Sequence, residues 1–336
     1  MDVSVAVIGA GYWGPNLIRN FATLSGCKLA AVCDLDPRRL VPVAEKYGVY
    51  TTTRMEDILR ERSIDAVAVA TPAETHRHVA EACLQAGKHA FVEKPLARTS
   101  AEAEVLIRLA GETSRVLMVG HIFLYDSAIC RLIELIRQGE VGKVRYAHGI
   151  RTSMAGTARL DTNVVWDALV HDAYVLPALM GRKPRRVLVV GQAYLAAGIE
   201  DVVFATFDFG EGVLAQLYVS WYALEKARRL VVVGSEAIAG YDDLAVPKLT
   251  LYRRRYERSG EMDAQGRPRW RWRDEGAEPI ATEGPEPLRL ECAHFVECVR
   301  KGDRPRTDGL AGLEALRVLE ACQHSLELGG VWKEVA

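Results

Sequence analysis

A glycine-rich turn near the N-terminus has the residue types and spacing of a phosphate-binding loop. The run Gly9-Ala10-Gly11-Tyr12-Trp13-Gly14 directly follows the apolar segment from Val3 to Ile8. In such a turn the first glycine permits the tight bend, the second lets a pyrophosphate approach the backbone, and the third lets the next helix lie close to the sheet. The positive end of that helix faces the phosphates. We therefore predict a dinucleotide site formed by Gly9, Gly11, Tyr12, Trp13 and Gly14.

An aspartate lies where the ribose of such a dinucleotide would be. Asp34 ends the second apolar run, about twenty residues after the glycine-rich turn, as the dinucleotide-binding pattern requires. Its carboxylate would accept hydrogen bonds from ribose hydroxyls and repel a 2′-phosphate, which favours NAD over NADP. NADP stays an alternative cofactor because Arg38 and Arg39 lie close to Asp34 in the sequence. The alternative role, capping the next helix, suits Asp36 better because Pro37 would occupy its first position.

A lysine is the first candidate for proton transfer. Lys94 follows the apolar run 90–92, and ligands of doubly wound sheets bind at the carboxyl ends of the strands. A lysine there can move a proton to or from a sugar oxygen if its pKa is lowered, which burial and a positive nicotinamide ring would do. A surface ammonium paired with Glu93 is the alternative.

A histidine is the second candidate. Asp167, His171 and Tyr174 fall at i, i+4 and i+7 of a predicted helix and so share one face. A histidine stacked one turn from an aspartate is suited to acid–base chemistry, although a structural histidine is the alternative. Asp167 would orient His171. Arg151 and Arg159, just before this helix, are candidates for binding a diphosphate because guanidinium forks match phosphate oxygens.

The elements that position the first set of residues alternate between strand and helix. Predicted strands cover residues 3–8, 29–33, 66–70, 90–92 and 116–119, and predicted helices 13–24, 37–46, 55–61, 74–86 and 100–110. Ser100 is expected to cap the last of these helices and Gly87 to end the one before. Repeated βα units predict a Rossmann domain, a doubly wound parallel sheet, over residues 1–120.

Residues 121–336 have the pattern of an α+β domain. Helices are predicted near 126–138, 164–180, 288–301 and 308–328, and strands near 143–151, 186–195, 201–209, 212–221, 228–234 and Val331. Consecutive strands with hairpin-length links favour an open, mostly antiparallel sheet with helices on one face. We expect the first domain to bind the cofactor and this one to bind substrate and mediate oligomerisation.

Composition excludes several classes of protein. The chain has 336 residues, 49% of them hydrophobic, with 43 Lys+Arg against 44 Asp+Glu. This balance excludes the strong global field of a nucleic-acid-binding protein. Seven cysteines without a CxxC pair favour free thiols in a cytoplasmic protein and suggest no metal site. The apolar N-terminal segment is too short to span a bilayer, so we expect no targeting segment and no membrane association.

The order of these motifs resembles the glucose–fructose oxidoreductase/inositol dehydrogenase (Gfo/Idh/MocA) family. GxGxxG, Asp34, Thr71-Pro72-Ala73-Glu74-Thr75-His76 and Glu93-Lys94-Pro95 occur in the family's order, and Asp167 to Asp172 resembles its DxxxHD helix. The resemblance implies the two-domain fold, a nicotinamide dinucleotide, a cis bond before Pro95, and a homodimer or homotetramer. It also implies a cofactor site that includes Thr71, Pro72, His76, Glu93 and Lys94, and a sugar site lined by His171 and Lys94.

Further segments resemble the branch of the family that acts on nucleotide-linked sugars. These are Gly120 to Tyr125 and Val165 to Asp167. The C-terminal runs 286–291, 294–295 and 302–309 also resemble the family. Two departures from the family pattern bear on which substrate is bound. Tyr125 is followed by Asp-Ser where the family usually has Asn-Pro, and Tyr174 stands where a small polar or acidic residue is usual. Tyr125 and Tyr174 are therefore candidates for contacting the substrate.

An arginine-rich segment, 253–273, is not explained by these motifs. It holds eight arginines and alternates strictly over Arg269-Trp270-Arg271-Trp272-Arg273. Period two predicts a strand with tryptophans on one face and arginines on the other, with a hairpin tip over 260–268. Such interleaving occurs in nucleic-acid-binding proteins, but five acidic residues dilute the charge, so a solvated or subunit-contacting hairpin is favoured.

Together these observations predict an NAD-dependent dehydrogenase that oxidises a ring hydroxyl at C3 of a nucleotide-linked sugar, such as UDP-N-acetylglucosamine or its uronate. Lys94 would take the hydroxyl proton and His171 would share or relay it. An NAD(P)H-dependent 3-ketosugar reductase and an inositol or polyol dehydrogenase are alternatives within the same class. A non-catalytic dinucleotide sensor is the alternative from another class, and the pair Lys94 and His171 argues against it.

Overall fold

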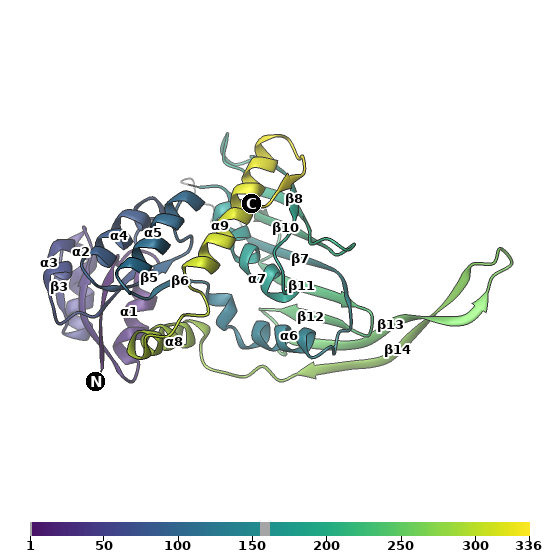
Figure 1. Cartoon of the computed structure of the whole chain (residues 1–336), viewed down its shortest axis with the longest axis horizontal. Helices are drawn as coiled ribbons and strands as arrows, with labels where there is room; N and C mark the ends of the chain where they lie inside the picture. Colours follow the sequence, from purple (N-terminus) through teal and green to yellow (C-terminus); the bar gives the residue numbers. More distant parts are fainter. Residues whose placement is uncertain (1, 155–161) are drawn as a thin grey trace. The chain divides into compact units, whose positions relative to one another are not determined.

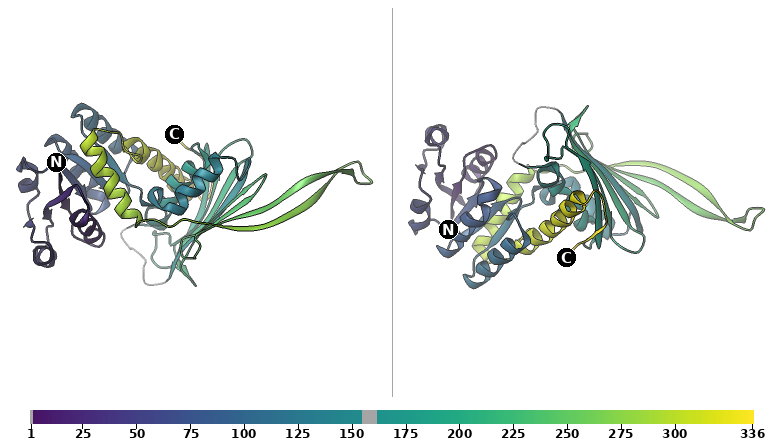
Figure 2. Two further views of the ribbon diagram at one scale, coloured as in Figure 1. Left: turned by 90° about the horizontal axis from the view of Figure 1, so that it is seen from below. Right: turned by 90° about the horizontal axis from the view of Figure 1, so that it is seen from above.

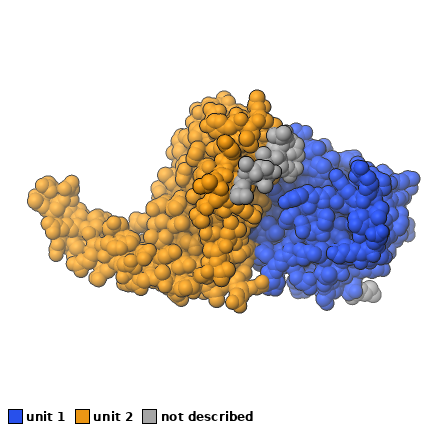
Figure 3. Space-filling model, turned by 180° about the vertical axis from the view of Figure 1, so that it is seen from behind, with its two compact units in different colours: residues 1–125, 285–317 blue, residues 126–284, 318–336 orange. Residues whose placement is uncertain are grey.

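The computed structural model describes residues 2–154 and 162–336, which form two compact units. Unit 1 comprises residues 1–125 and 285–317, and unit 2 comprises residues 126–284 and 318–336 (Figure 3). The predicted boundary at residue 120 lies close to the first division. Residues 285–317, which the sequence pattern groups with the second domain, instead cluster with unit 1.

Unit 1 is built on a six-stranded parallel sheet in the order β3-β2-β1-β4-β5-β6 (Figure 1). Its strands are β1 (Val3–Ile8), β2 (Cys27–Cys33), β3 (Tyr50–Thr52), β4 (Ala66–Val69), β5 (His89–Glu93) and β6 (Leu117–Gly120). Its helices are α1 (Gly14–Thr23), α2 (Pro37–Tyr47), α3 (Met55–Arg60), α4 (His76–Gln85), α5 (Ser100–Glu112), α8 (Pro287–Lys301) and the short 3₁₀ helices η1 (Ala73–Thr75) and η2 (Ile122–Tyr125). The predicted doubly wound sheet is confirmed. The edge strand β3 has no apolar run, which is why the sequence pattern does not predict it.

Two helix starts show how local sequence sets the boundaries. The Asp36 side chain accepts a hydrogen bond from the Arg38 backbone N–H at 3.0 Å, and Pro37 is the first residue of α2, so the predicted cap is confirmed. The predicted cap Ser100 is wrong by one residue. Thr99 caps α5, since its hydroxyl accepts from the Glu102 N–H at 3.2 Å.

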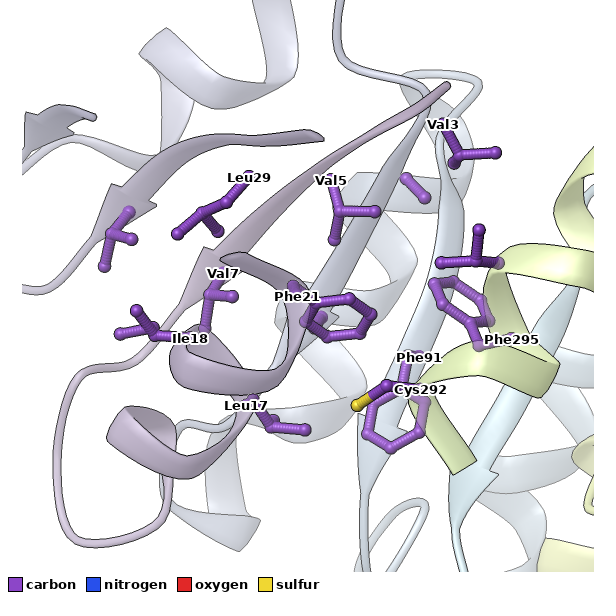
Figure 4. Packing of buried hydrophobic residues seen from close by; sticks show 14 of the residues in the cluster. Val3, Val5, Val7, Leu17, Ile18, Phe21, Leu29, Phe91, Cys292 and Phe295 are labelled. Atoms are coloured by element: carbon purple, nitrogen blue, oxygen red, sulfur yellow. The ribbon is translucent and has the colours of Figure 1, made fainter. Parts of the chain in front are cut away.

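Helix α8 belongs to unit 1 because its apolar side completes the core. Phe21 of α1, Phe91 of β5 and Phe295 of α8 are fully buried and meet edge to face, with ring centroids 5.7–6.5 Å apart (Figure 4). Edge-to-face aromatic contacts add stability beyond the area that they bury. Strand β5, which directly precedes the candidate base Lys94, is therefore held by a segment about 200 residues away in sequence.

Unit 2 contains a nine-stranded mixed sheet in the order β14-β13-β12-β11-β7-β10-β9-β8-β15. Its strands are β7 (Val144–Met154), β8 (Arg186–Gln192), β9 (Val202–Asp208), β10 (Leu214–Ala223), β11 (Ala227–Gly234), β12 (Ile238–Asp242), β13 (Leu249–Met262), β14 (Pro268–Ile280) and β15 (Lys333–Glu334). The pair β7 and β10 is parallel and the other pairs are antiparallel, as predicted. Helices α6 (Ser127–Arg137) and α7 (Val170–Met180) lie on one face (Figure 2). The helix α9 (Gly309–Glu327) begins in unit 1 and ends in unit 2.

The arginine-rich segment forms the outer part of the β13–β14 hairpin, which extends beyond the other strands of its sheet (Figure 1). Tyr256 pairs with Trp272 and Arg258 with Trp270, so both tryptophans lie on one face as predicted. Two arginines share that face, however, because Arg254 and Arg258 alternate with Tyr256 on the opposite strand.

The glycine-rich turn gives a test of the packing in unit 1. A Cβ on Gly14 would overlap the Gly9 carbonyl oxygen, whereas a Cβ on Gly111 of α5 would meet nothing within 4 Å. We expect Gly14→Ala to lower the free energy of unfolding by about 1–3 kcal/mol. Gly111→Ala should instead raise it by about 0.5–1 kcal/mol, because alanine favours a helix. Midpoints of chemical denaturation measure both, and an equal effect of the two substitutions would contradict the packing described.

Candidate functional site

The glycine-rich turn connects β1 to α1 with room for a ligand backbone. Gly9 has φ of +102°, and a Cβ there would lie 2.5 Å from the Ala70 carbonyl oxygen. At Gly11 the nearest atom to such a Cβ is the Arg39 Nη1 at 3.4 Å. Trp13 is half-buried at the start of α1, and the Tyr12 side chain is 94% exposed. The turn thus brings the ends of β1 and β4 close together beside the N-terminus of α1, which is the arrangement that binds the pyrophosphate of a dinucleotide.

Asp34 lies at the carboxyl end of β2 and contacts that turn. Its Oδ2 accepts a hydrogen bond from the Ala10 N–H at 2.6 Å, and its Oδ1 accepts one from the Asp36 N–H at 2.9 Å. The Arg39 Nη1 lies 3.5 Å from Oδ2. A carboxylate has about four acceptor positions, so these contacts leave capacity for ribose hydroxyls. Asp34 thus also stabilises the turn, a role that its spacing in the sequence does not reveal.

His76 joins the loops that follow β4 and β5. Its Nδ1 lies 2.7 Å from the Pro95 carbonyl oxygen, and its Nε2 lies 2.9 Å from that of Thr71. The hydroxyl of Thr71, which directly precedes Pro72, also accepts a hydrogen bond from the Thr75 hydroxyl at 2.8 Å. The Lys94–Pro95 peptide bond is cis, as the resemblance implies. His76 is buried and its ring nitrogens face backbone oxygens, so it positions the loop on which Lys94 lies.

Glu93 and Lys94 follow at the end of β5. Glu93 is paired with Gly120 of β6, and a Cβ on Gly120 would lie 2.9 Å from the Glu93 Oε2, so the glycine makes room for the carboxyl group. The Lys94 N–H donates to the same oxygen at 3.3 Å. Burial raises the pKa of Glu93 to about 7, against the lowering effects of the Lys94 ammonium and the Trp13 indole.

Two buried ionisable residues that the sequence analysis did not single out lie beside this pair. His121 is 1% exposed, and burial and the Lys94 charge lower its pKa to about 3, so it is neutral. Glu291 of α8 is fully buried, and neither of its carboxyl oxygens has a hydrogen-bond partner among the described residues. Burial, and then the charge of Glu93, raise its pKa well above the usual value. The signal in the sequence is its place between Leu288 and Phe295 on the apolar side of a helix.

In unit 2 the helix that carries His171 starts differently from the prediction. Residues Val165–Leu169 form a π-helical turn, η3, which is followed by α7. The predicted stripe assumes 3.6 residues per turn throughout, and a π-helical turn holds more residues. The period of 3.6 residues per turn therefore does not hold throughout the predicted helix. The Asp167 Oδ2 accepts a hydrogen bond from the indole Nε1 of Trp221 in β10 at 3.0 Å.

His171 and Tyr174 are brought together as predicted. The Tyr174 hydroxyl lies 2.8 Å from the His171 Nδ1, and the rings meet edge-on at 85°. His171 is half-buried, whereas Tyr174 is 5% exposed. The Tyr174 phenol, which departs from the family pattern, is thus hydrogen-bonded to His171.

The other predicted contacts of the substrate are distributed over both units. Arg151 of β7 donates from Nε at 2.7 Å and from Nη2 at 3.0 Å to the carboxylate of buried Asp172, which forms a bidentate ion pair. Tyr125 of unit 1 is buried, with its hydroxyl 3.3 Å from the Thr307 Oγ1 and the Arg306 guanidinium over its ring. Arg159 lies outside the described residues.

The described residues, 2–154 and 162–336, lack two features. They contain no group of three or more His, Cys, Asp or Glu side chains that could hold a metal ion. None of their helices is both long enough and apolar enough to cross a membrane.

Comparison with known proteins gives consistent matches over both units. Residues 3–121 match the oxidoreductase family with an NAD-binding Rossmann fold, and residues 129–239 match the Gfo/Idh/MocA C-terminal domain. UDP-N-acetylglucosamine 3-dehydrogenase of Acidithiobacillus ferrooxidans is 33% identical over 73% of this chain and 75% of its own. Its solved structure has a TM-score of 0.83, covering 98% of this chain and 99% of that one at 28% identity. D-apiose dehydrogenase of Paraburkholderia graminis is 26% identical over 96% of this chain and 88% of its own.

Glu291 gives a pH-dependent prediction. Its pKa is raised in the folded chain, so folding binds a proton, and stability is lost as pH rises above the unfolded value of about 4.3. The loss is up to about 1.4 kcal/mol per pH unit until the folded pKa is reached. Glu291→Gln replaces the protonated acid by a neutral amide. We expect its stability relative to wild type to increase from pH 5 to pH 8.

Thermal unfolding midpoints at the two pH values measure this difference. Glu112→Gln, at an exposed glutamate of α5, is the matched control and should show no such change. A constant offset between Glu291→Gln and wild type at both pH values would show that Glu291 is charged in the folded chain.

Proposed function

Because this chain belongs to the Gfo/Idh/MocA family of oxidoreductases, we propose that it transfers a hydride between NAD and C3 of a nucleotide-linked sugar such as UDP-N-acetylglucosamine or its uronate. It is an NAD(P)-dependent enzyme acting on a CH–OH group of a sugar. The observation that supports the finer proposal is the similarity to a UDP-N-acetylglucosamine 3-dehydrogenase, which extends over both units.

The residues of the two units take separate roles in this proposal. Lys94 accepts the proton of the sugar hydroxyl during oxidation and returns it during reduction. His171 contacts the same oxygen and shares or relays the proton, and Asp167 orients His171. A bound nicotinamide dinucleotide supplies the hydride acceptor or donor. Positioning of the reacting groups and the acid–base pair each lower the barrier, the latter by about a hundredfold to ten-thousandfold in rate.

The cofactor is proposed to be NAD. Asp34 would face the ribose hydroxyls and disfavour a 2′-phosphate. The alternative, NADP, is favoured by one observation. The Arg39 Nη1 lies 3.5 Å from the Asp34 Oδ2, and it is also the atom nearest to the position of a Cβ on Gly11. A cation therefore lies beside the carboxylate that would bind the ribose. Glu93, His76, Thr71 and Pro72 complete the proposed cofactor site.

Contacts with the substrate remain proposals for Arg151, Arg159, Tyr125 and Tyr174. For Arg151 the proposal has to accommodate the bidentate pair with Asp172, which engages two of its three guanidinium nitrogens. For Tyr125 the proposal has to accommodate a ring that is buried in the structure. The 26% identical D-apiose dehydrogenase, whose name denotes an unlinked sugar, keeps a free sugar or polyol as the alternative substrate class.

Kinetics of the purified chain test the proposal. With NAD and then NADP, UDP-N-acetylglucosamine, its uronate, D-apiose and myo-inositol are compared by the absorbance of the reduced cofactor. We expect the nucleotide sugars to have the highest kcat/KM. Lys94→Ala should lower kcat by about a hundredfold to ten-thousandfold. Lys28→Ala, at an exposed lysine of β2, should leave it unchanged.

Each alternative has its own outcome. Turnover of myo-inositol or D-apiose alone would exclude the nucleotide-sugar substrate. Faster reduction of a 3-ketosugar than oxidation of the sugar would favour the reductase. Tight NAD binding without turnover of any sugar would favour the dinucleotide sensor, and near-normal turnover by Lys94→Ala would exclude Lys94 as the base.

The partner proposed for unit 2 is a second copy of this chain. The sheet face opposite α6 and α7 carries large apolar side chains that are 36–47% exposed: Tyr146, Ile150, Val190, Phe204 and Leu214. Phe204 and Tyr218 stack at 5.2 Å on this face. The hairpin adds Tyr256, Trp270 and Trp272, which are 46–63% exposed. Apolar surface of this kind is typical of subunit interfaces.

A charge placed on this face should disrupt the oligomer. We expect wild type to have the mass of a dimer or tetramer by light scattering, and Phe204→Glu to shift the mass towards the monomer, because a carboxylate cannot be buried without a partner. Trp272→Glu tests the hairpin in the same way. Tyr50→Glu, at an exposed tyrosine of β3 in unit 1, is the control. A monomeric wild type would contradict the proposal.

A further inference from the structure

The pair formed by His171 and Tyr174 has a geometry that constrains the proton on the imidazole. The two residues lie three positions apart on α7, and the Tyr174 hydroxyl is 2.8 Å from the His171 Nδ1. The ring centroids are 5.9 Å apart and nearly perpendicular, so the phenol oxygen approaches the edge of the imidazole, where its nitrogens lie. Tyr174 is 5% exposed, which keeps water from competing for this hydrogen bond.

General chemistry decides which of the two groups donates. A phenol O–H, with an ordinary pKa near 10, is a stronger donor than the N–H of a neutral imidazole. The unprotonated imidazole nitrogen, with a pKa near 6.5, is in turn a far stronger acceptor than a phenol oxygen. The favourable arrangement for a neutral histidine is therefore Tyr174 O–H donating to Nδ1. A neutral imidazole has one N–H, so that proton is then on Nε2.

A buried cation next to the phenol favours the same arrangement. The Arg151 guanidinium forms an ion pair with Asp172, the residue that follows His171 in the sequence. Both side chains of this pair are largely buried. Burial lowers the pKa of Arg151, but Asp172 and, to a smaller extent, Tyr174 raise it above its usual value, so the phenol lies within the field of the guanidinium. A cation attracts the lone pairs of the phenol oxygen, and the O–H is thereby directed to another acceptor.

We propose that Tyr174 is a positioning residue that donates its hydroxyl proton to Nδ1 of His171 and so fixes the imidazole as the tautomer protonated on Nε2. This inference deepens the proposed function, since it assigns His171 a role in the same reaction. In that tautomer His171 contacts the substrate oxygen as an N–H donor, and Lys94 is the group that accepts the hydroxyl proton. Tyr174 then acts through His171, which is the alternative to a direct contact with the substrate.

Nuclear magnetic resonance of the ¹⁵N-labelled full chain tests the tautomer without substrate or cofactor. Two-bond ¹H–¹⁵N correlations distinguish the two neutral tautomers of each histidine, and the signal lost in His171→Gln assigns His171 among the eight histidines. At a pH where His171 is neutral we expect the Nε2–H pattern in wild type and a mixture of tautomers in Tyr174→Phe. Tyr222→Phe, at an exposed tyrosine of β10, should retain the wild-type pattern.

Kinetics provide a second readout that a purely structural role would not give. Tyr174→Phe should lower kcat about tenfold to hundredfold with little change in KM, which is the cost of removing a partner that orients a functional histidine. The double variant with His171→Gln should be no slower than His171→Gln alone, because Tyr174 acts through that residue. Thermal unfolding of Tyr174→Phe checks that the fold is retained.

The outcomes separate this inference from the proposed function. An Nδ1–H tautomer in wild type, or an unchanged tautomer in Tyr174→Phe, would overturn the role of Tyr174 whatever the substrate proves to be. A failure of all tested sugars to react would overturn the proposed function and leave the tautomer measurement intact. Additive losses of kcat in the double variant would assign Tyr174 a direct contact with substrate.

Discussion

Burying an ionisable side chain costs several kcal/mol unless an opposite charge or hydrogen-bond donors surround it, and both units meet this constraint around their candidate residues. In unit 1, burial lowers the pKa of His121 and raises that of Glu291, which favours the neutral form of each, and Asp34 is stabilised by two backbone N–H groups. In unit 2, Asp172 is paired with Arg151. The residues around Lys94 and His171 are thus ones that either stay neutral when buried or have a hydrogen-bond donor or an opposite charge beside them.

This constraint explains why the neighbours of Lys94 come from distant segments. Burial raises the pKa of Glu93 to about 7, and Gly120 leaves room for its carboxyl group. Burial, and then the charge of Glu93, raise the pKa of Glu291, which lies on α8, a helix that joins unit 1 from a distant part of the chain. The contact among Phe21, Phe91 and Phe295 holds that helix in place. Aromatic packing in the core thereby contributes to the electrostatics at the end of β5.

In unit 2 the same constraint bears on the roles of Tyr174 and Arg151. A tyrosine in place of a small polar residue first suggests a substrate contact, because it is the largest local departure from the family pattern. In the structure its hydroxyl meets His171, and Arg151, a candidate for binding a diphosphate, holds Asp172. The Tyr174 hydroxyl is therefore placed to support a histidine, which needs a fixed orientation and a fixed proton to act on an oxygen.

The sequence by itself determined the elements that follow from local patterns: the βα alternation, the glycine-rich turn with Asp34, the cap at Asp36, and the hairpin with both tryptophans on one face. Each depends on neighbouring residues or on a fixed period. The tertiary structure alone decided that residues 285–317 join unit 1, that Glu291 lies near Glu93, and that Asp167 contacts Trp221 through a π-helical turn. These outcomes depend on packing between segments far apart in the chain, about which local periodicity carries no information.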